Sequence, residues 1–494
     1  MSMSNFPRSL TSRHVASACL AVSLLGLGGC AQIPSLGVAP KLKPVEQLES
    51  AKSFSTPMVA WPGDHWWEAY GDPQLNALVE EALHGSPNLE LAQARLRMAQ
   101  ASVQGASAPL MPEVDANASV AESRQSYNYL MPRSALPQGW NDYGQATLNL
   151  NWELDFWGKN HSAFAAAISE QRAAEAEVAQ TRLVLSTSVA AAYAELLHLF
   201  AVRDTAEVSL VLRAETVALF RQRYDNGMEN LAGVRQMEAR QAGAKAELLA
   251  VEERIALLKN GMAALLGEGP DRGLEITRPT VQMIGDAGLP ANLSLELLGR
   301  RPDIVAARLR TEAAAKRIDQ QKAGFYPSVN LMAFVGVQAL DLNKMTKSGS
   351  GFGSVGPAVS LPIFNTRGLQ AQLRGARAEY DASVAVYNAT LSNALREVAD
   401  AATSRKALDG ELAASRAAVA AAVNAYQIVD QRYRGSLATY LDVLTAEDAL
   451  VSAQRSLADV ETRAVVLDVA MVRALGGGYQ SPEKQPSGKL EING

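Results

Sequence analysis

Cys30 is the residue of this sequence best placed for covalent chemistry, because it closes the stretch "LLGLGGCAQIP" near the start of the chain. Two arginines, a mostly apolar run at 15–25 and a pair of glycines precede it, which is the order of a secretory signal peptide. The tetrapeptide LGGC matches the bacterial lipobox, whose cysteine becomes the mature N-terminus and carries fatty acyl chains. We therefore expect residues 1–29 to be removed and Cys30 to be lipidated, and Ala31 after it is typical of outer-membrane sorting. Cys19 lies in the removed segment, so no internal disulfide is expected in the mature protein.

Other patterns that could support catalysis or ligand binding are incomplete. The stretch "GFGSVG" at 351–356 has the G-x-G-x-x-G spacing, but the residues after it read as a strand and not as a helix that could hold a pyrophosphate. No G-x-S-x-G nucleophile elbow is present. No metal-binding spacing relates the histidines of the mature chain, which are His65, His84, His161 and His198. The sequence therefore predicts neither an enzyme nor a cofactor, apart from the covalent lipid.

The composition argues against nucleic acid as a partner and against membrane-spanning helices. The 494 residues carry 46 basic and 51 acidic side chains, a net charge of −5, with no strongly basic region. After Cys30 no stretch approaches the roughly 18 uninterrupted apolar residues that a membrane helix needs. Any part of the body that enters a bilayer is therefore expected to do so as strands.

The sequence contains an internal duplication. The stretch "SPNLELAQARLRMAQASVQGASAPLMPEV" aligns with "RPDIVAARLRTEAAAKRIDQQKAGFYPSV" at an offset of 215 residues. Farther along, Arg223-Tyr224 aligns with Arg432-Tyr433 at an offset of 209 residues. Two copies of about 210 residues are too few and too long for a solenoid, so we expect one duplicated structural unit.

Each copy predicts the same order of elements, namely a helix, a strand pair, a very long helix and a second long helix. The strand pairs, at about 113–152 and about 328–361, alternate apolar with polar residues. Each strand is about ten residues long, as in transmembrane β-barrels, and aromatic residues gather near the strand ends, where interfacial girdles lie. An ordinary half-buried sheet would show the same alternation.

The long helices set the dimensions of the protein. A helix of about 65 residues is about 100 Å long and can only pack along other long helices, where its many alanines permit close approach. Four amphipathic strands cannot close a barrel, and each open edge in lipid leaves unpaired backbone groups at several kcal/mol each. The chain must therefore oligomerise, and two, three or four copies would give 8, 12 or 16 strands. Strands continued by long helices predict a conduit fixed to the outer membrane.

The sequence resembles the outer membrane factors of tripartite efflux pumps, the TolC and OprM type, in their lipoprotein branch. The resemblance covers nearly all of the mature chain and is specific through four stretches taken together, which are "WWEAYGDPQLNALVEEALHGSPNL", "LLGRRPDIVAARLR", "AGFYPSV" and "RYRGSLATYLDVL". It implies a homotrimer with a 12-stranded β-barrel and a periplasmic α-helical tunnel closed at its inner tip. It also implies a periplasmic adaptor and an inner-membrane transporter, commonly of the resistance-nodulation-division class, as partners.

The expected fold class is therefore mainly α with transmembrane β, four strands per chain. The expected organisation is a signal peptide (1–29), a lipidated tether (30–60), a first repeat (61–270, strand pair about 113–152, long helices about 160–266), a second repeat (271–476, strand pair about 328–361, long helices about 366–475) and a flexible tail (477–494).

The resemblance also implies which residues close the tip of the tunnel. By position, Tyr433 is a gate residue and Asp442 supplies a ring of carboxylates, which repel one another and favour cations. This sequence departs from the family pattern in two ways. Thr445 stands where a second aspartate is often found, and Gly435 comes one position early, with Ser436 in the place of the turn glycine.

Four more residues are candidates for the tip, but they could equally be ordinary polar residues at helix ends. They are Arg434, Asp430, Arg223 and Tyr224. The first-repeat equivalent of Asp442 is glycine, so only one carboxylate ring is expected.

Two other functions stay open. A structural lipoprotein whose coiled coils bridge envelope layers would share the lipobox and the long helices, but it would not need paired strands. A channel for secreted polypeptides, as in type I secretion, would share the fold. Such channels usually lack a lipobox, so Cys30 favours the efflux of small molecules such as drugs.

Overall fold

The structure is a computed structural model that describes residues 33–49, 54, 58–126, 128, 132–281, 288–290, 292–363 and 365–482. Cys30 and Cys19 lie outside these residues. The chain divides into two compact units, and each unit draws on both sequence repeats. The first unit consists of Met1–Lys41, Arg97–Ala173 and Arg308–Val386, and the second of Leu42–Leu96, Ala174–Ala307 and Tyr387–Gly494.

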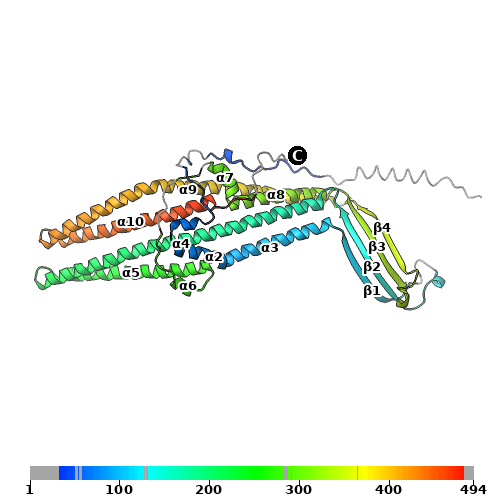
Figure 1. The fold of residues 1–494 in the computed structure, drawn as a ribbon, viewed down its shortest axis with the longest axis horizontal. Helices are drawn as coiled ribbons and strands as arrows, with labels where there is room; N and C mark the ends of the chain where they lie inside the picture. Colours follow the sequence, from blue (N-terminus) through cyan, green and yellow to red (C-terminus); the bar gives the residue numbers. More distant parts are fainter. Residues whose placement is uncertain are drawn as a thin grey trace, which may run out of the picture. The chain divides into compact units, whose positions relative to one another are not determined.

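A four-stranded antiparallel sheet dominates the first unit (Figure 1). Its strands are β1 (Glu113–Ser123), β2 (Asn141–Leu154), β3 (Ser328–Leu340) and β4 (Gly351–Ser360), paired in that order. The first repeat supplies β1 and β2 and the second supplies β3 and β4, so the two hairpins join through their neighbouring strands. β1 and β4 are left as the edges of the sheet.

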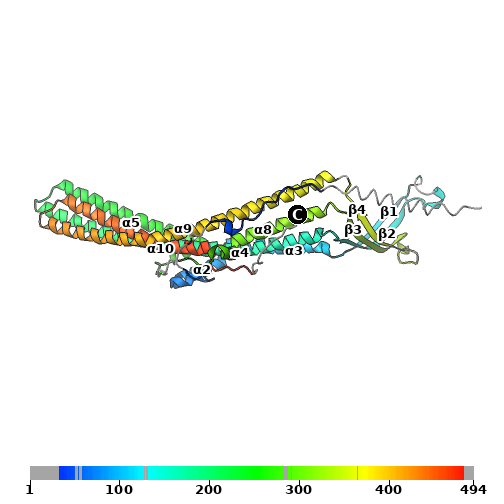
Figure 2. The same cartoon turned by 90° about the horizontal axis from the view of Figure 1, so that it is seen from above.

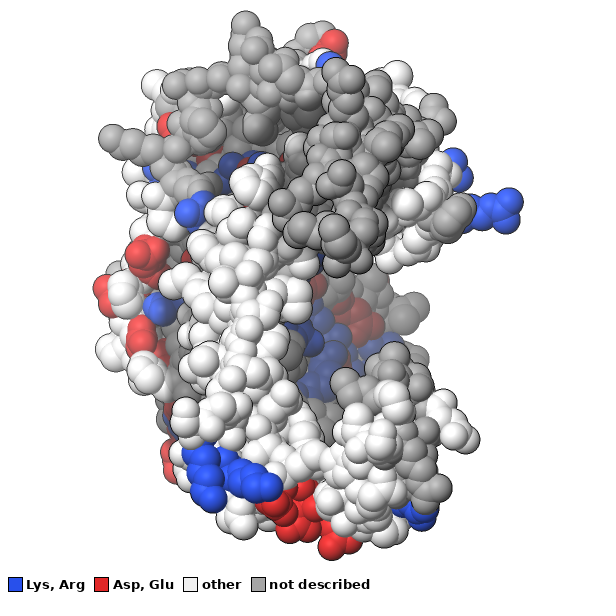
Figure 3. Space-filling model, turned by 90° about the vertical axis from the view of Figure 1, so that its right-hand side faces the viewer, with Lys and Arg blue, Asp and Glu red and all other residues white. Residues whose placement is uncertain are grey.

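The register gathers most apolar positions of the four strands on one face, as the alternation predicts, although Phe334 of β3 lies on the other face. Leu148 of β2 lies opposite Val335 of β3, and Val329 of β3 lies opposite Val359 of β4. This face is bare, since Val335 is 62% exposed and Val359 67% exposed. No strand contains Lys or Arg, and uncharged side chains make up much of the surface in Figure 3. An uncovered apolar sheet face of this kind fits a lipid environment.

Each hairpin is followed by one very long helix, as the sequence predicts. These helices are α4 (Lys159–Asp225, 67 residues) and α9 (Thr366–Arg434, 69 residues). Both contain an 18-residue window apolar enough, by length and composition only, to cross a membrane; 61% of that window is buried in α4 and none in α9. Alanine-rich windows with few charged residues meet this criterion without an uninterrupted apolar run.

The second unit is a bundle built on two helical hairpins. α4 pairs with α5 (Leu231–Leu266) and α9 with α10 (Tyr440–Leu475), and the partners lie side by side in Figures 1 and 2. The remaining α-helices of the described chain are α2 (Pro73–Gly85), α3 (Pro87–Ser107), α6 (Asp271–Leu274), α7 (Leu293–Arg300) and α8 (Pro302–Ala323). Short 3-10 helices span Val45–Gln47, Trp66–Tyr70, Ala108–Leu110, Arg133–Ala135 and Leu342–Lys344.

The bundle is held by an apolar core. Trp67, Leu78 and Leu196 are almost fully buried within one cluster, which includes side chains from α2, α4, α5 and α10. A second cluster includes Leu297 and Leu391, from α7 and α9. Burial of these apolar side chains is the main stabilising contribution to the bundle.

The same backbone contact ends the last helix of both repeats, which agrees with the duplication. Gly267 caps α5 with φ 84°, and Gly476 caps α10 with φ 90°. A Cβ on Gly267 would overlap the carbonyl oxygen of Gly85, and a Cβ on Gly476 would overlap that of Arg300, the equivalent of Gly85. Only glycine fits these two positions, because each needs both a left-handed conformation and close backbone approach.

Parts of the expected tether and tail pack on the body. The backbone N–H of Lys43 donates to Asn388 Oδ1 at 2.9 Å, and Val45 is 5% exposed. At the other end of the chain, the N–H of Ser481 donates to the carbonyl of Gly299 at 2.9 Å. Backbone hydrogen bonds and burial therefore hold these residues against the bundle.

The glycine caps allow a matched test of stability. We expect Gly476→Ala to destabilise the protein by at least about 1–2 kcal/mol, because alanine is strained in the left-handed conformation and its Cβ overlaps Arg300. Gly243→Ala, within α5 and with open space around its Cα, should instead stabilise it by about 0.5–1 kcal/mol. Loss of helical circular dichroism on heating measures both. Equal effects of the two variants would contradict the role of Gly476.

Candidate functional site

The candidate gate lies at the turns of the two helical hairpins. The two turns have the same backbone hydrogen bond and the same left-handed residue position. In the α4–α5 turn the N–H of Met228 donates to the carbonyl of Arg223 at 2.8 Å, and in the α9–α10 turn the N–H of Leu437 donates to that of Arg432 at 2.7 Å. Gly227 has φ 72°, and its equivalent Ser436 has φ 59°. The second turn therefore keeps the left-handed residue at the expected place, with serine instead of glycine.

Tyr433 joins the two hairpins from a buried position. It is 2% exposed, and its ring stacks on Phe220 of α4 with centroids 5.9 Å apart. Its hydroxyl donates to Glu229 Oε1 at 3.0 Å, in the α4–α5 turn. Burial and the Glu229 carboxylate raise the pKa of Tyr433 to about 12, so the hydroxyl keeps its proton and remains a donor.

Arg223 completes this cluster. Its guanidinium lies 4.7 Å from the centroid of the Tyr433 ring, and its Nε lies 3.9 Å from Glu229 Oε1. The side chains of Arg223 and Glu229 are only 16% and 13% exposed. The structure therefore brings two predicted residues, Arg223 and Tyr433, together with two that the sequence analysis missed, Phe220 and Glu229.

The other predicted tip residues do not join the cluster. Arg434 and Asp430 form an ion pair at 2.9 Å one helical turn apart on α9, with the Arg434 side chain 64% exposed. Tyr224 is 42% exposed. An exposed pair of this spacing contributes only about 0.3–0.5 kcal/mol, so these residues read as helix-end polar residues in the single chain.

Asp442 has a local structural role. It is residue N3 of α10, and its Oδ2 accepts from the backbone N–H of Thr439 at 2.8 Å and from the Thr439 hydroxyl at 2.7 Å. The backbone N–H of Asp442 donates back to Thr439 Oγ1 at 3.3 Å, which completes a capping box. The hydrogen bonds from Thr439 lower the pKa of Asp442, so the carboxylate stays charged. The carboxylate ring itself remains a prediction.

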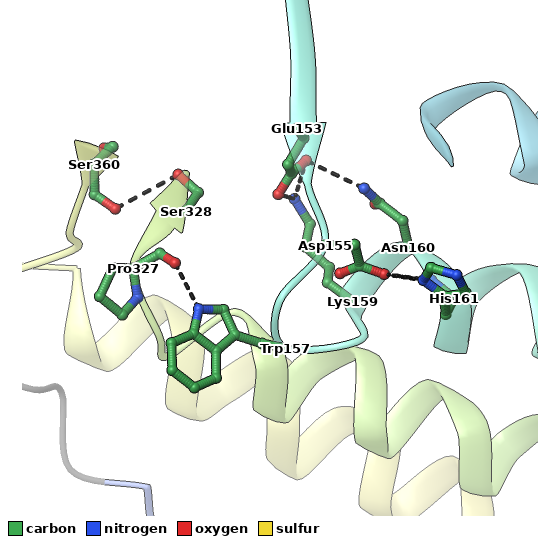
Figure 4. A network of polar contacts seen from close by, with 9 residues as sticks. All are labelled: Glu153, Asp155, Trp157, Lys159, Asn160, His161, Pro327, Ser328 and Ser360. Carbon is green, nitrogen blue, oxygen red and sulfur yellow. Dashed lines mark hydrogen bonds and ion pairs between the residues drawn. The ribbon is translucent and has the colours of Figure 1, made fainter. Parts of the chain in front are cut away.

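A second polar network fixes the start of α4 against the sheet (Figure 4). Asp155 Oδ2 accepts from the N–H of His161 at 2.8 Å and lies 2.6 Å from its Nδ1. Lys159 Nζ lies 3.1 Å from Glu153 at the end of β2. These contacts bridge the few residues between strand and helix, and so set the direction in which α4 leaves β2.

Aromatic residues cluster at the same junction. Trp157 Nε1 donates to the carbonyl of Pro327 at 2.8 Å, just before β3, and its ring stacks on Tyr326 with centroids 4.7 Å apart. Trp157 is 50% exposed and Phe156 67% exposed. Exposed aromatic rings at strand ends match the aromatic belt of membrane barrels.

Among the described residues, no group of three or more His, Cys, Asp or Glu side chains could hold a metal ion.

Comparison with known sequences identifies the family. The family model described as "Outer membrane efflux protein" matches residues 78–268 and 293–477, one segment in each repeat. The chain is 32% identical to the multidrug resistance outer membrane protein MdtP of Shigella flexneri over 485 residues, which cover 94% of this chain and 97% of that one. It is 33% identical to the fusaric acid resistance protein FusA of Burkholderia cepacia over 374 residues, covering 74% and 70% of the two chains.

Solved structures have the same fold. The outer membrane protein VceC of Vibrio cholerae superposes with a TM-score of 0.81 at 46% identity, covering 85% of this chain and all of that one. The outer-membrane channel OprN superposes with a TM-score of 0.80 at 28% identity, covering 91% and 99%. The family consists of channels and not of enzymes. With both repeats matched and the fold shared along most of its length, the chain belongs to the outer membrane efflux protein family.

Proposed function

We propose that three copies of this chain form an outer-membrane exit duct that releases small molecules, such as drugs, from a tripartite efflux pump. Each copy contributes four strands to a 12-stranded barrel and its long helices to a periplasmic tunnel. The observation that carries this proposal is the open sheet, with an exposed apolar face and two unpaired edge strands. The names of the relatives support small molecules as cargo, since MdtP is a multidrug resistance protein and ArpC of Pseudomonas putida is part of an antibiotic efflux pump.

The sheet edges provide the physical reason for assembly. β1 has 11 residues and β4 has 10, and in each strand about half of the backbone N–H and C=O groups point away from the neighbouring strand. Each such group left unpaired in lipid costs several kcal/mol. Pairing β4 of one copy with β1 of the next satisfies all of them when the ring closes, and twelve strands leave a lumen wider than side chains alone would fill.

The opposite face of the sheet suits a water-filled lumen. Gln145, Asn149 and Asn330 lie on it, together with Gln338. Asn149 Nδ2 also donates across the strands to Asp115 at 3.0 Å. Polar side chains inside and apolar side chains outside are the arrangement of open transmembrane barrels.

The proposed exit duct also implies partner proteins and a membrane anchor. We infer a periplasmic adaptor and an inner-membrane transporter of the resistance-nodulation-division class. Equivalent apolar side chains are exposed at both hairpin turns, with Met228 56% exposed and Leu437 72% exposed, and these would suit contact with an adaptor. We further propose that Cys30 is lipidated and holds the N-terminus at the outer membrane.

The assembly itself is the first test. Purified full-length protein in lipid nanodiscs should give a trimer mass by native mass spectrometry, and it should conduct ions in planar bilayers. A band on unheated gels that shifts to the monomer after boiling gives an independent measurement. A stable, non-conducting monomer would contradict the duct and favour a structural lipoprotein.

The Tyr433–Glu229 hydrogen bond is proposed to help close the tip. Tyr433→Phe removes the hydroxyl but keeps the ring on Phe220, so we expect the closed state to weaken by about 1.5–3 kcal/mol per copy and the resting conductance to rise. Tyr440→Phe is the matched control. The Tyr440 ring packs edge-on against Phe220 at 5.7 Å, but its hydroxyl has no hydrogen-bond partner among the described residues. Equal leak through both variants would count against the gate.

Asp442 is proposed to form a ring of carboxylates that binds divalent cations. Asp442→Asn should abolish block of the bilayer conductance by divalent cations while keeping an acceptor for the helix cap. Protonation removes the charge that holds the cation, so block of the wild type should weaken as the buffer is acidified.

Thr439→Ala separates charge from helix capping. It removes the hydroxyl of the capping box, at a cost of about 1 kcal/mol, but leaves the carboxylate charge in place. Divalent block should therefore survive in this variant. Block that survives Asp442→Asn, or that is lost in Thr439→Ala, would show that Asp442 serves α10 only as a cap.

A further inference from the structure

Glu447 is a buried carboxylate that lies on the second turn of α10, five residues beyond Asp442. The residue is 1% exposed, although glutamate is almost never buried without a partner. Its Oε1 lies 3.3 Å from Arg213 Nε of α4. Its Oε2 is buried and has no hydrogen-bond partner among the described residues, and neither has Arg213 Nε. The pair is therefore close but incompletely satisfied, which makes the charged form of Glu447 costly.

Arg213 forms hydrogen bonds with acceptors other than Glu447. Its Nη2 donates to Asp448 Oδ1 at 3.3 Å and its Nη1 donates to the carbonyl of Arg240 at 3.3 Å. Arg240 of α5 donates in turn to Asp448 Oδ2 at 2.9 Å. Asp448 thus accepts from both guanidinium groups, and α4, α5 and α10 are tied together at one level. Glu447 lies beneath this exposed bridge as a second carboxylate.

The groups around Glu447 come from all four long helices. α4 provides Arg213 and Thr216, α5 provides Arg240, α9 provides Tyr426, and α10 provides Asp448. Burial raises the pKa of Glu447, and the effects of Arg213 and Arg240 do not offset it. Tyr426 stays uncharged, since burial, with Asp430 and Glu447 nearby, raises its pKa to about 12. The site therefore holds a proton on Glu447 more tightly than an exposed glutamate would.

We propose that Glu447 is a proton-dependent latch that holds α10 against α4, so that the tip of the channel is tighter when this carboxyl is protonated. The proposal rests on the exit-duct function argued above and assigns to it a control by periplasmic pH. The structural basis is a buried acid with one unsatisfied oxygen, at a contact between α4 and α10 close to the tip.

The sign of the pH dependence follows from burial. Moving α10 away from α4 would hydrate Glu447 and return its pKa to the ordinary value near 4.5. The closed arrangement has the higher pKa, so it binds the proton more tightly. The extra stability of the closed arrangement is fully present below the ordinary pKa of Glu447. It is lost as the pH rises through the raised pKa of the closed arrangement. Acidification should therefore favour the closed channel, and raising the pH should favour its release.

The duplication provides a matched control. The first-repeat equivalent of Glu447 is Glu238, on the second turn of α5. Glu238 is satisfied by two arginines, with Arg221 Nη2 at 2.6 Å and Arg235 Nη1 at 2.7 Å, and these hydrogen bonds lower its pKa. A proton-dependent effect is therefore expected from Glu447 and not from Glu238.

The first experiment measures hydrogen exchange at the start of α10 in the full-length trimer, corrected for intrinsic rates, from about pH 5 to about pH 7.5. In the wild type, protection should fall as the pH rises, by up to about tenfold for each pKa unit that separates the closed and open states. Glu447→Gln, which copies the protonated form, should stay protected at every pH. Glu238→Gln should behave as the wild type does.

Bilayer conductance of the same three proteins separates this proposal from the duct function. Wild-type open probability should rise with pH, and Glu447→Gln should stay at its low acidic value. A pH response of the exchange that survives in Glu447→Gln overturns the latch, even if the channel conducts. Absence of conductance in every variant, with the exchange response intact, overturns the duct and leaves Glu447 as a conformational latch.

Discussion

The pairing of backbone groups in lipid is the constraint on which the rest of this structure depends. A sheet that stops at β1 and β4 has an apolar face with nothing covering it and two rows of unpaired amides. Neither helices within the chain nor water in a bilayer can satisfy those amides. Strand number, register and the bare apolar face of the sheet therefore all point to further strands from other copies. The long helices then have to surround a common axis, because they begin directly after β2 and β4.

Comparison of the two repeats separates residues that the backbone conformation requires from residues that could serve the channel function. Positions with strict backbone demands are the same in both repeats, as shown by Gly267 and Gly476 at the helix ends. Even the serine of the second turn keeps a left-handed conformation that glycine would adopt more easily. Charged positions near the turns have diverged instead. The first repeat has a glycine in place of Asp442, and in place of Glu447 it has Glu238, which is paired with two arginines.

Much of the fold could be predicted from the sequence, because periodicity encodes it directly. The alternation around Leu148 and Val335 gave the correct sheet face, and the proline-free runs gave the long helices. The Tyr433–Glu229 contact could not be predicted, since 204 residues separate its partners and it forms only when two hairpins pack. The capping role of Asp442 was readable in principle, because threonine three residues before an acidic residue is a known helix start. The family resemblance directed attention to the pore instead.

The proposed gate can open without unfolding the bundle because far fewer side chains join the hairpins at the tip than build the core. The core around Trp67 and Leu196 buries many large apolar side chains, each contributing about 1.5–3 kcal/mol. At the tip the hairpins are joined by a smaller apolar cluster, which includes Phe220 and Tyr433, and by a few polar contacts, of which the Tyr433–Glu229 hydrogen bond is one. Such a bond contributes about 1.5–3 kcal/mol when its acceptor is charged. A partner or a proton that alters two or three of these contacts can therefore shift the tip while the core stays packed.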